Sequence, residues 1–362
     1  MSNLASHFAG GRDYLAACTL GLPSRATVAA VRADLESAAS GRPDVVAASQ
    51  AVEEARASYA HLVSSPVGDV AIGSQTSVQV SLIAASVPDG AEVLCAEGDF
   101  SSLVAPFAHV GRGVRLRTAP LRELAAAISA DTWLVAFSLV QSATGEVADA
   151  VGIAAAAARA GARTLCDLTQ AAGWLPVDAT MFDATVCHAY KWLCCPRGVS
   201  FLTLTPAFAG EIRPVQAGWY SGADPWSSCY GTGGTLAADA RRFDVSPAWQ
   251  AFTGAAPALA LFADADITAT YAHVTGLAAR FRDGLGLEHP ERPSAIVTWP
   301  DATGEALAQL TAHGITASGR AGRARVAFHV FNDELDVDRA LHALGVRGGE
   351  DLSAFDGLVY AI

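Results

Sequence analysis

The chain has 362 residues, 51% of them apolar and 17% charged, which suffices for a large and a small compactly folded domain. Its formal net charge of −12 at pH 7 speaks against a general nucleic-acid-binding surface. The sequence has no charge-free apolar stretch of about 18 residues, and residues 1–8 lack the basic region and apolar run of a signal peptide, so we expect neither a membrane span nor secretion.

The seven cysteines are an odd number, and none belongs to a Cys-x-x-Cys pair. Most lie in apolar runs, so we interpret them as reduced, buried thiols of a cytoplasmic protein. Without paired ligand spacing, no metal site is expected. Redox activity of the adjacent Cys194 and Cys195 is the open alternative.

Helical spacing of apolar residues predicts a helix from residue 25, a break at 41–43 and a second helix from 49 to about 63. Short apolar runs then alternate with helical stretches. Strands are expected at 92–96, 132–138, 163–166, 185–188 and 199–204, with a helix over 148–160. This alternation is typical of an α/β fold in which a mostly parallel sheet has helices on both faces.

A segment rich in glycine, serine, proline and tryptophan, residues 218–234, interrupts the alternation and indicates a long ordered loop, which often has a function. After about residue 250, a helix-rich section leads to expected strands at 296–299 and 325–328 and to a final helix over 333–344. We therefore predict a large domain over 1–250, whose N-terminal segment packs on the other domain, and a small α+β C-terminal domain over 251–362.

Two charged residues stand out because their surroundings are apolar. Lys191 lies in the apolar stretch 184–198, and Asp167 ends the apolar run 163–167. Both fall at the ends of expected strands, where α/β sheets bind ligands, so the two side chains could face one site. They could hold the two ends of a pyridoxal phosphate (PLP) ring, with the lysine as a Schiff base and the aspartate at the ring nitrogen.

A phosphate site is expected where a strand leads into a helix, because a helix N-terminus has free N–H groups and a positive dipole end. Residues 72–83 fit this description: Gly73 permits a tight turn, and Ser74, Gln75 and Thr76 supply donors ahead of an apolar helix face. An ordinary helix N-cap is the alternative. The sequence has neither the Gly-x-Gly-x-x-Gly nor the Gly-x-x-x-x-Gly-Lys pattern, which disfavours dinucleotide and nucleoside-triphosphate sites.

Three segments together resemble the class V aminotransferases: residues 167–178, Tyr190-Lys191 with 196–198, and 325–332. This family belongs to the fold type I PLP superfamily, with kynureninases and cysteine desulfurases as relatives. The order and spacing match over residues 14–345. The resemblance implies a fold type I PLP-dependent transferase, PLP as cofactor, an amino-acid substrate, and a homodimer with shared active sites.

The resemblance also implies a role for each matching residue. Lys191 carries the cofactor and is the base at the α-carbon, Asp167 keeps the ring nitrogen protonated, and Arg325 grips the substrate carboxylate. At the cofactor ring, the resemblance implies that Phe100 stacks on the ring and that Gln170 contacts the ring's 3-oxygen or the lysine. At the phosphate, it implies contacts from His188 and Tyr190, and from Ser246 to the phosphate of the other subunit. It also implies that Trp219 contacts the substrate or the neighbouring phosphate. The alternative for Phe100, His188 and Trp219 is a role in core packing. Asp167 could instead cap a helix, and Gln170 could be a polar residue in the first turn of a helix. Arg325 could instead be an exposed surface arginine.

The sequence departs from two relatives. Cysteine desulfurases need a mobile cysteine on the loop before the carboxylate-binding arginine, but residues 314–323 contain none, so persulfide chemistry is not expected. Kynureninases have an asparagine where this chain has Val245-Ser-Pro247, which argues against recognition of an aryl amine.

The sequence therefore predicts a PLP-dependent enzyme that removes the α-proton of a small amino acid, with a class V aminotransferase as the leading interpretation. A PLP-dependent lyase that cleaves a C–C or C–S bond is the alternative. A non-catalytic PLP-fold binding or regulatory module is the alternative from another class.

Overall fold

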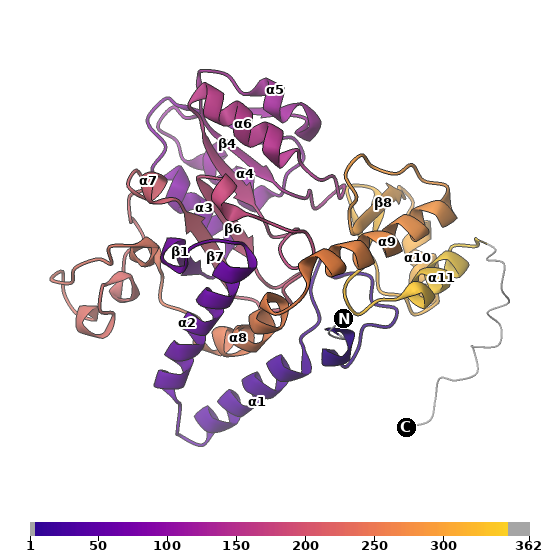
Figure 1. Ribbon diagram of the computed structural model, residues 1–362, viewed down its shortest axis with the longest axis horizontal. Coiled ribbons are helices and arrows are strands. Elements are labelled where there is room, and N and C mark those ends of the chain that lie inside the picture. The colour runs from indigo at the N-terminus through magenta and orange to yellow at the C-terminus, as the bar shows by residue number, and fades with distance from the viewer. Residues whose placement is uncertain (1–3, 347–362) are drawn as a thin grey trace.

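The computed structural model describes residues 4–346, which form a larger and a smaller body, each built on its own β-sheet (Figure 1). The larger sheet has seven strands in the order β1-β7-β6-β5-β4-β2-β3. Neighbouring strands from β3 to β6 run parallel, whereas β7 is antiparallel to both β6 and β1. The strands are β1 Val70–Gly73, β2 Glu92–Ala96, β3 Arg115–Ala119, β4 Thr132–Ser138, β5 Arg163–Asp167, β6 Ala184–His188 and β7 Ser200–Leu204.

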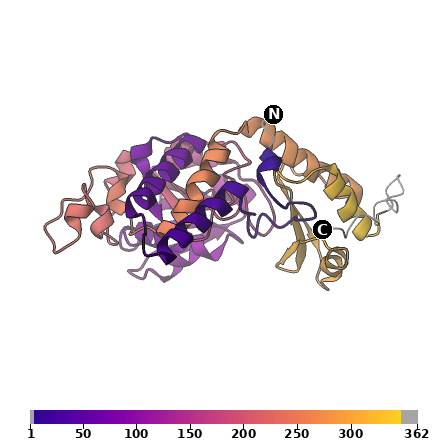
Figure 2. The ribbon, with the colours of Figure 1, turned by 90° about the horizontal axis from the view of Figure 1, so that it is seen from below.

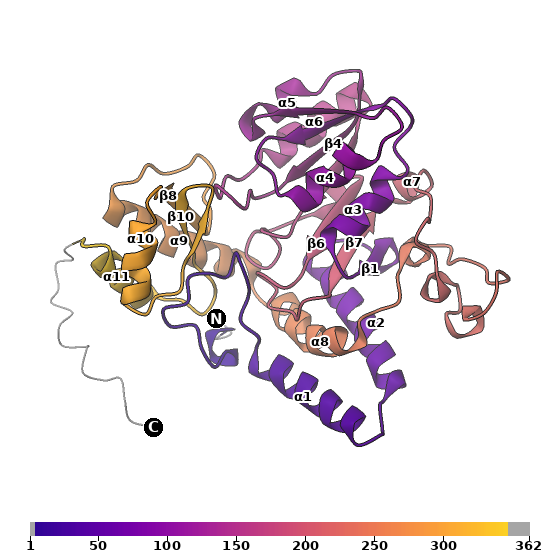
Figure 3. The ribbon, with the colours of Figure 1, turned by 180° about the vertical axis from the view of Figure 1, so that it is seen from behind.

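Both faces of this sheet are covered by helices, because successive strand residues point to opposite sides. In β5, Cys166 belongs to the hydrophobic cluster that includes residues of α2, α6 and α8, whereas Leu165 belongs to the cluster that includes residues of α3, α4 and α7 on the other face. Figures 1 and 3 show the sheet from these two sides. The helices are α1 Arg25–Ala39, α2 Val45–Leu62, α3 Thr76–Ala84, α4 Ser101–His109, α5 Leu124–Ala127, α6 Ala150–Ala160, α7 Pro206–Ala209 and α8 Trp249–Ala263. The predicted α/β class with a mostly parallel sheet is thereby confirmed, and β7 makes the two antiparallel pairs of the sheet.

Helix α2 begins earlier than the sequence pattern predicted. A side-chain oxygen of Asp44 accepts a hydrogen bond from the backbone N–H of Ala47 at 2.9 Å, which caps the helix at Val45 instead of residue 49. A buried ion pair joins this helix to the segment before α8: Arg56 Nη2 lies 2.7 Å from Asp244 Oδ2. Asp244 also accepts the N–H of Ile72 at 2.7 Å, so the pair fixes β1 and hence the start of α3.

The smaller body has a three-stranded antiparallel sheet with the order β8-β10-β9. The N-terminal segment packs on it: the N–H of Leu15 donates to Thr316 O, the N–H of Ala327 donates to Leu15 O, both at 2.8 Å, and the Leu15 side chain is buried in this body's core. Figure 2 shows this segment beside the small sheet. The elements are α9 Ile267–Leu285, β8 Ile296–Pro300, α10 Glu305–Ala312, β9 Ser318–Arg320, β10 Arg323–Ala327 and α11 Glu334–Ala343.

The loop predicted over 218–234 contains two short 3-10 helices, Trp219–Ser221 and Trp226–Ser228, and projects from the large body at the left of Figure 1. Two of its aromatic side chains, Trp226 and Tyr230, are exposed, whereas Tyr220 is buried. Within residues 4–346, no helix is both long enough and apolar enough to cross a membrane. The same part of the chain holds no cluster of histidine, cysteine and acidic side chains that could bind a metal ion.

Candidate active site

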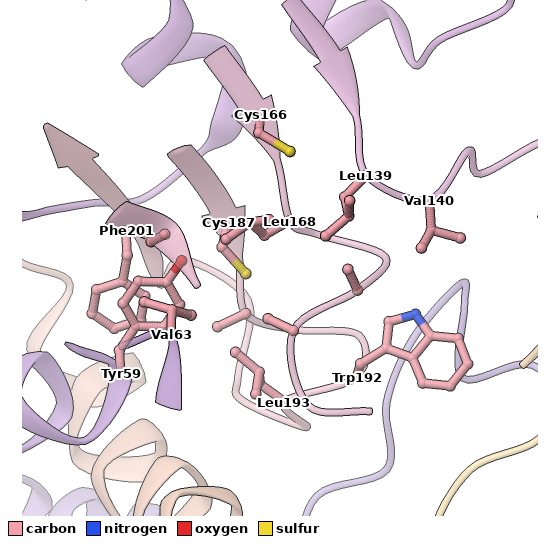
Figure 4. Packing of buried hydrophobic residues seen from close by; sticks show 14 of the residues in the cluster. Tyr59, Val63, Leu139, Val140, Cys166, Leu168, Cys187, Trp192, Leu193 and Phe201 are labelled. Atoms are coloured by element: carbon pink, nitrogen blue, oxygen red, sulfur yellow. The ribbon is translucent and has the colours of Figure 1, made fainter. Parts of the chain in front are cut away.

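A cavity of about 260 Å³ lies where the central parallel strands end. Ser138, Asp167 and His188 are the last residues of β4, β5 and β6, and their adjoining positions place them at one edge of the sheet. Figure 4 shows the apolar residues packed beneath this edge, among them Cys166, Cys187 and Leu168. The cavity is lined by Gln75, Thr76, Ser77, Phe100, Ser102, Ser138, Val140, Ser142, Asp167, Thr169, Gln170, His188, Tyr190, Lys191 and Arg197.

Lys191 follows β6 and is buried, with 6% of its surface accessible. Its Nζ lies 5.4 Å from the ring centre of Phe100 and 5.6 Å from that of Tyr190, and among residues 4–346 no hydrogen bond or salt bridge to Nζ is present. Burial is the main cause that lowers the Lys191 pKa to about 8, against the opposing charge of Asp167. The cavity therefore contains a primary amine that is readily deprotonated near neutral pH.

Lys191 is also the only lysine of the whole chain. The other 23 of its 24 basic residues, counting lysine and arginine, are arginines. The single lysine can be read from the sequence and would by itself have indicated Lys191 as a functional residue.

Asp167 ends β5, and its Oδ1 accepts the backbone N–H of Thr169 at 2.8 Å. Burial raises the pKa of this carboxyl group, whereas the hydrogen bonds from Thr169 and the charge of Lys191 act in the opposite direction. Because this buried carboxylate accepts a hydrogen bond only from Thr169 among the described residues, it is suited to a cationic partner in the cavity.

The α3 end of the cavity has free donors. The N-cap residue Gln75 makes no side-chain capping bond, so the first N–H groups of α3, at Thr76 and Ser77, are available to an anion. His188 Nε2 is buried without a hydrogen-bond partner, and Arg197 brings a positive charge, its Cζ lying 4.4 Å above the Tyr190 ring. Burial, with the charge of Arg197, lowers the pKa of His188 to about 4, so the imidazole is neutral at pH 7. This end fits the phosphate of PLP, and Asp167 and Lys191 fit its ring.

The turn before α3 differs from its predicted form. Ser74 is partly exposed and does not line the cavity, unlike Gln75 and Thr76. Gly73 is not in a left-handed conformation. A Cβ atom there would lie 2.7 Å from the end of the Gln79 side chain, so glycine avoids a close contact with that side chain.

Arg325, in β10 of the smaller body, does not itself line the cavity, but it hydrogen-bonds to Ser142, which does. It is buried, with 1% of its surface accessible, and among the described residues its guanidinium has no acidic partner within salt-bridge distance. Its N–H groups donate only to neutral oxygens. Nη1 donates to the Ser142 carbonyl and, at 3.0 Å, to Ser142 Oγ. Nη2 donates to Thr19 Oγ1 at 2.8 Å, and Nε donates to Ser318 Oγ at 3.1 Å. A buried cation without a counterion is suited to bind an anion.

Gln170 lines the cavity, and its side-chain amide is fully engaged. Its oxygen accepts the indole N–H of Trp192 at 2.7 Å, and its nitrogen donates to Cys18 O at 2.9 Å and to Ser142 Oγ at 3.0 Å. Trp192 itself is buried beside Val140 (Figure 4).

Besides Ser74 and Arg325, two further predicted site residues do not line this cavity. Ser246 is exposed just before α8. Trp219 packs against Tyr220, Trp226 and Trp249. Neither residue lines the cavity of its own chain, so the assignment of Ser246 to the phosphate of the other subunit, and of Trp219 to the substrate or the neighbouring phosphate, stays a prediction.

Several lining residues were missed by the sequence analysis. Arg197 had a usable signal, because it is a charged residue within the matched segment 196–198. Thr169 also had one, since it follows the strand end at Asp167. Ser77, Ser102 and Ser142 had none, because a serine in a loop or first helical turn is too common to be singled out.

The sequence of this chain is similar to one protein family and to individual enzymes. Residues 34–294 match the family model described as aminotransferase class-V. The chain is 32% identical over 183 residues to isopenicillin N epimerase from Streptomyces clavuligerus, a match that spans 46% of each protein. It is 28% identical over 287 residues to kynureninase from Deinococcus radiodurans, covering 73% of this chain and 70% of the other. The chain thus spans about half the length of the epimerase that it matches.

Two solved structures have the same fold. A cysteine desulfurase from Escherichia coli superposes with a TM-score of 0.81 at 20% identity, covering 95% of this chain and 97% of the other. A cystine C–S lyase superposes with a TM-score of 0.81 at 21% identity, covering 92% and 97%. Together with the family match, the fold shows that this chain belongs to the class V aminotransferase family of fold type I enzymes, whose cofactor is PLP.

Proposed function

We propose that this protein removes the α-proton of a small α-amino acid, with Lys191 as the acid–base group. The observation that carries the proposal is the single lysine. The chain has arginine at every other basic position, yet the buried position in the cavity has a primary amine. Arginine could supply a positive charge there, but it cannot be deprotonated and so cannot bond covalently to an aldehyde.

The other residues of the cavity follow from this role. Bound PLP supplies an electron sink for the electron pair left at the substrate's α-carbon. Asp167 holds a proton on the ring nitrogen, and the α3 N-terminus, His188 and Arg197 hold the phosphate. Arg325 binds the substrate α-carboxylate, which would supply the counterion that it lacks. Phe100 covers one side of the ring, and Ser246 and Trp219 act in the site of a second subunit in a homodimer.

Transamination is the outcome we propose first, because the family model that matches 34–294 describes aminotransferases. The second candidate is cleavage of a β-substituent, favoured by the similarity to kynureninase over 287 residues. Both outcomes begin with loss of the α-proton, and in both Lys191 is the only amine in the cavity that could remove it.

A panel of amino acids incubated in D₂O, with and without keto acids, tests the proposal. Exchange of the α-hydrogen for deuterium is expected with at least one small amino acid. Formation of a new amino acid only when a keto acid is present would support transamination, and release of a β-fragment without one would support cleavage. If no amino acid exchanges its α-hydrogen and none changes the cofactor spectrum, the protein is a binding or regulatory module and the proposal fails.

The depressed pKa of Lys191 predicts how cofactor uptake depends on pH. Only the neutral amine attacks an aldehyde, and its fraction falls about tenfold for each pH unit below the pKa. The rate at which apoprotein gains the cofactor absorption band should therefore rise with pH and level off above about 8, the pKa of Lys191. Stopped-flow absorbance between pH 6 and 10 measures this rate. A midpoint at the ordinary lysine value of 10.5 would contradict the burial argument.

A further inference from the structure

Three arginines lie on one face of the small sheet. Arg323 and Arg325 are two residues apart in β10, so their side chains point to the same side of the sheet. Arg320, in β9, is paired directly with Arg323 in the antiparallel register and therefore points to that side as well. We call Arg320, Arg323 and Arg325 the arginine cluster.

The face that carries the arginine cluster is turned toward the large body. In β10, Val326 points to the opposite face and belongs to the core of the small body. Ala327 follows Arg325 by two residues, and both Ala327 and its partner Ile296 in β8 belong to the core of the large body. The cluster therefore lies along the boundary between the two bodies, on the side where Arg325 donates to Ser142 in the cavity lining.

The positive charge of the cluster is not balanced by nearby acids. Among residues 4–346, no acidic side chain lies within salt-bridge distance of any of the three arginines. Like charges directly opposite each other destabilise a pair of strands, so Arg320 opposite Arg323 lowers stability with no compensating carboxylate. The chain as a whole has a net charge of −12, which makes a local excess of arginines unusual and suited to an anionic ligand.

The three arginines differ in how far their N–H groups are already used. Arg325 is buried and donates to neutral oxygens, as described above. Arg323 is half-buried and donates to Thr298 through Nε and Nη2, each at 3.1 Å. Arg320 is exposed, and the one hydrogen bond of its guanidinium to a described residue runs from Nη1 to Gly319 O at 2.6 Å. Since a guanidinium has five N–H donors, Arg320 keeps most of its donors for a ligand.

The charge of Arg320 also reaches the residues to which the proposed function assigns the chemistry. Burial is the main cause that lowers the pKa of Arg325, and the charge of Arg320 lowers it further. The pKa of Lys191, which is lowered to about 8 chiefly by burial, is also depressed by the charges of Arg325 and Arg320. A surface arginine remote from the cavity would have neither effect.

We propose that Arg320 binds an acidic group on the side chain of the substrate, so that the substrates are acidic α-amino acids of the aspartate and glutamate type. The inference rests on the proposed function, in which Arg325 binds the α-carboxylate. Arg320 is the diagonal neighbour of Arg325 across the two strands, which places their backbones about 7–8 Å apart. Two guanidinium groups at this spacing can each bind one carboxylate of the same four- or five-carbon amino acid.

Two variants separate a local role of Arg320 from a general effect of charge. Arg320→Gln removes the positive charge and keeps a polar side chain. Arg159→Gln is the matched control, because Arg159 is also exposed and, among the described residues, has no acidic partner within salt-bridge distance. Arg159 lies in the last turn of α6 and does not line the cavity, so its replacement changes the net charge equally and leaves the arginine cluster intact.

Dissociation constants of the holoenzyme for L-aspartate, L-glutamate and their amides, L-asparagine and L-glutamine, are measured from the cofactor spectrum. Each acid has nearly the shape of its amide and differs from it in charge. In the wild-type protein, at least one acid should bind about tenfold more tightly than its amide, and added salt should reduce this difference. Arg320→Gln should weaken binding of that acid about tenfold and of its amide less than twofold. Arg159→Gln should keep the wild-type ratio.

Equal affinity for acids and amides in the wild-type protein would overturn the inference. It would also be overturned if Arg320→Gln weakened an acid and its amide equally, or if Arg159→Gln abolished the preference as well. Exchange of the α-hydrogen in D₂O separates these failures from failure of the proposed function. If a neutral amino acid such as L-alanine exchanges and no acid is preferred, the role of Arg320 alone is wrong. If no amino acid exchanges or changes the spectrum, the proposed function fails and the inference falls with it.

Discussion

Replacement of Lys191 by arginine should lower turnover by at least about 10³-fold, because the variant loses both the covalent bond to the cofactor and the base at the α-carbon. Arginine keeps the positive charge beside Asp167 and is the basic residue that the chain uses everywhere else. The variant should therefore fold and bind the cofactor without fixing it covalently. Turnover of the best amino acid from the panel, and the cofactor spectrum before and after borohydride, measure these effects.

Lys191→Ala is the companion variant, because it opens space that a small amine can fill. Added methylamine should restore part of its turnover, and it should restore less to Lys191→Arg, whose side chain occupies the position. Turnover within a few-fold of wild type in either variant would exclude Lys191 as the base, since no second lysine exists to replace it.

Replacement of Asp167 by asparagine should lower turnover by about 10²–10³-fold without destabilising the apoprotein, because the electron sink loses a charge that acts as the α-proton leaves. Burial raises the pKa of Asp167, so its charge is costly in the unliganded fold and a neutral isostere relieves that cost. Thermal unfolding of the apoprotein and turnover of the holoenzyme are the two measurements. The variant should still bind PLP.

Asp244→Asn is the matched control for this change. Asp244 is also buried with a raised pKa of about 6, but it pairs with Arg56 and does not line the cavity. Removing that charge leaves the buried Arg56 with only Glu53, whose side chain is half exposed, as an acidic partner, so the control should lose up to about 3 kcal/mol of stability. Asp167→Asn is therefore expected to lower turnover, whereas Asp244→Asn is expected to lower stability. A large loss of stability in Asp167→Asn would contradict its assignment as a functional charge.

Most of the large sheet could be predicted because its buried strands are short apolar runs. Strand β3 could not, since Arg115-Leu-Arg-Thr-Ala119 lies at the sheet edge and only its last residue is buried. Its pairing with β2 depends on tertiary structure, and a polar segment of this kind does not predict a strand from the sequence alone. The antiparallel direction of β7 also had no signal in the strand itself.

The candidate site was predictable where charged residues stand out in apolar surroundings, as Lys191, Asp167 and Arg197 do. It was not predictable where function depends on contacts between distant segments. Nothing local in the sequence joins Ser142 to Arg325 or to Gln170, because the three come from different loops and strands that meet only in the fold. Residue identity therefore indicated the cofactor chemistry, whereas the support for the carboxylate-binding arginine required the structure.

We expect Lys191 to carry PLP, and because it is the single lysine of the chain, its labelling can be tested directly. Apoprotein is mixed with PLP, reduced with borohydride, digested, and mapped by mass spectrometry. The only primary amines in the chain are Lys191 and the N-terminal α-amino group. One reduced cofactor per chain is expected, on the peptide that contains Lys191. Absence of incorporation, or label on the N-terminal peptide alone, would contradict it.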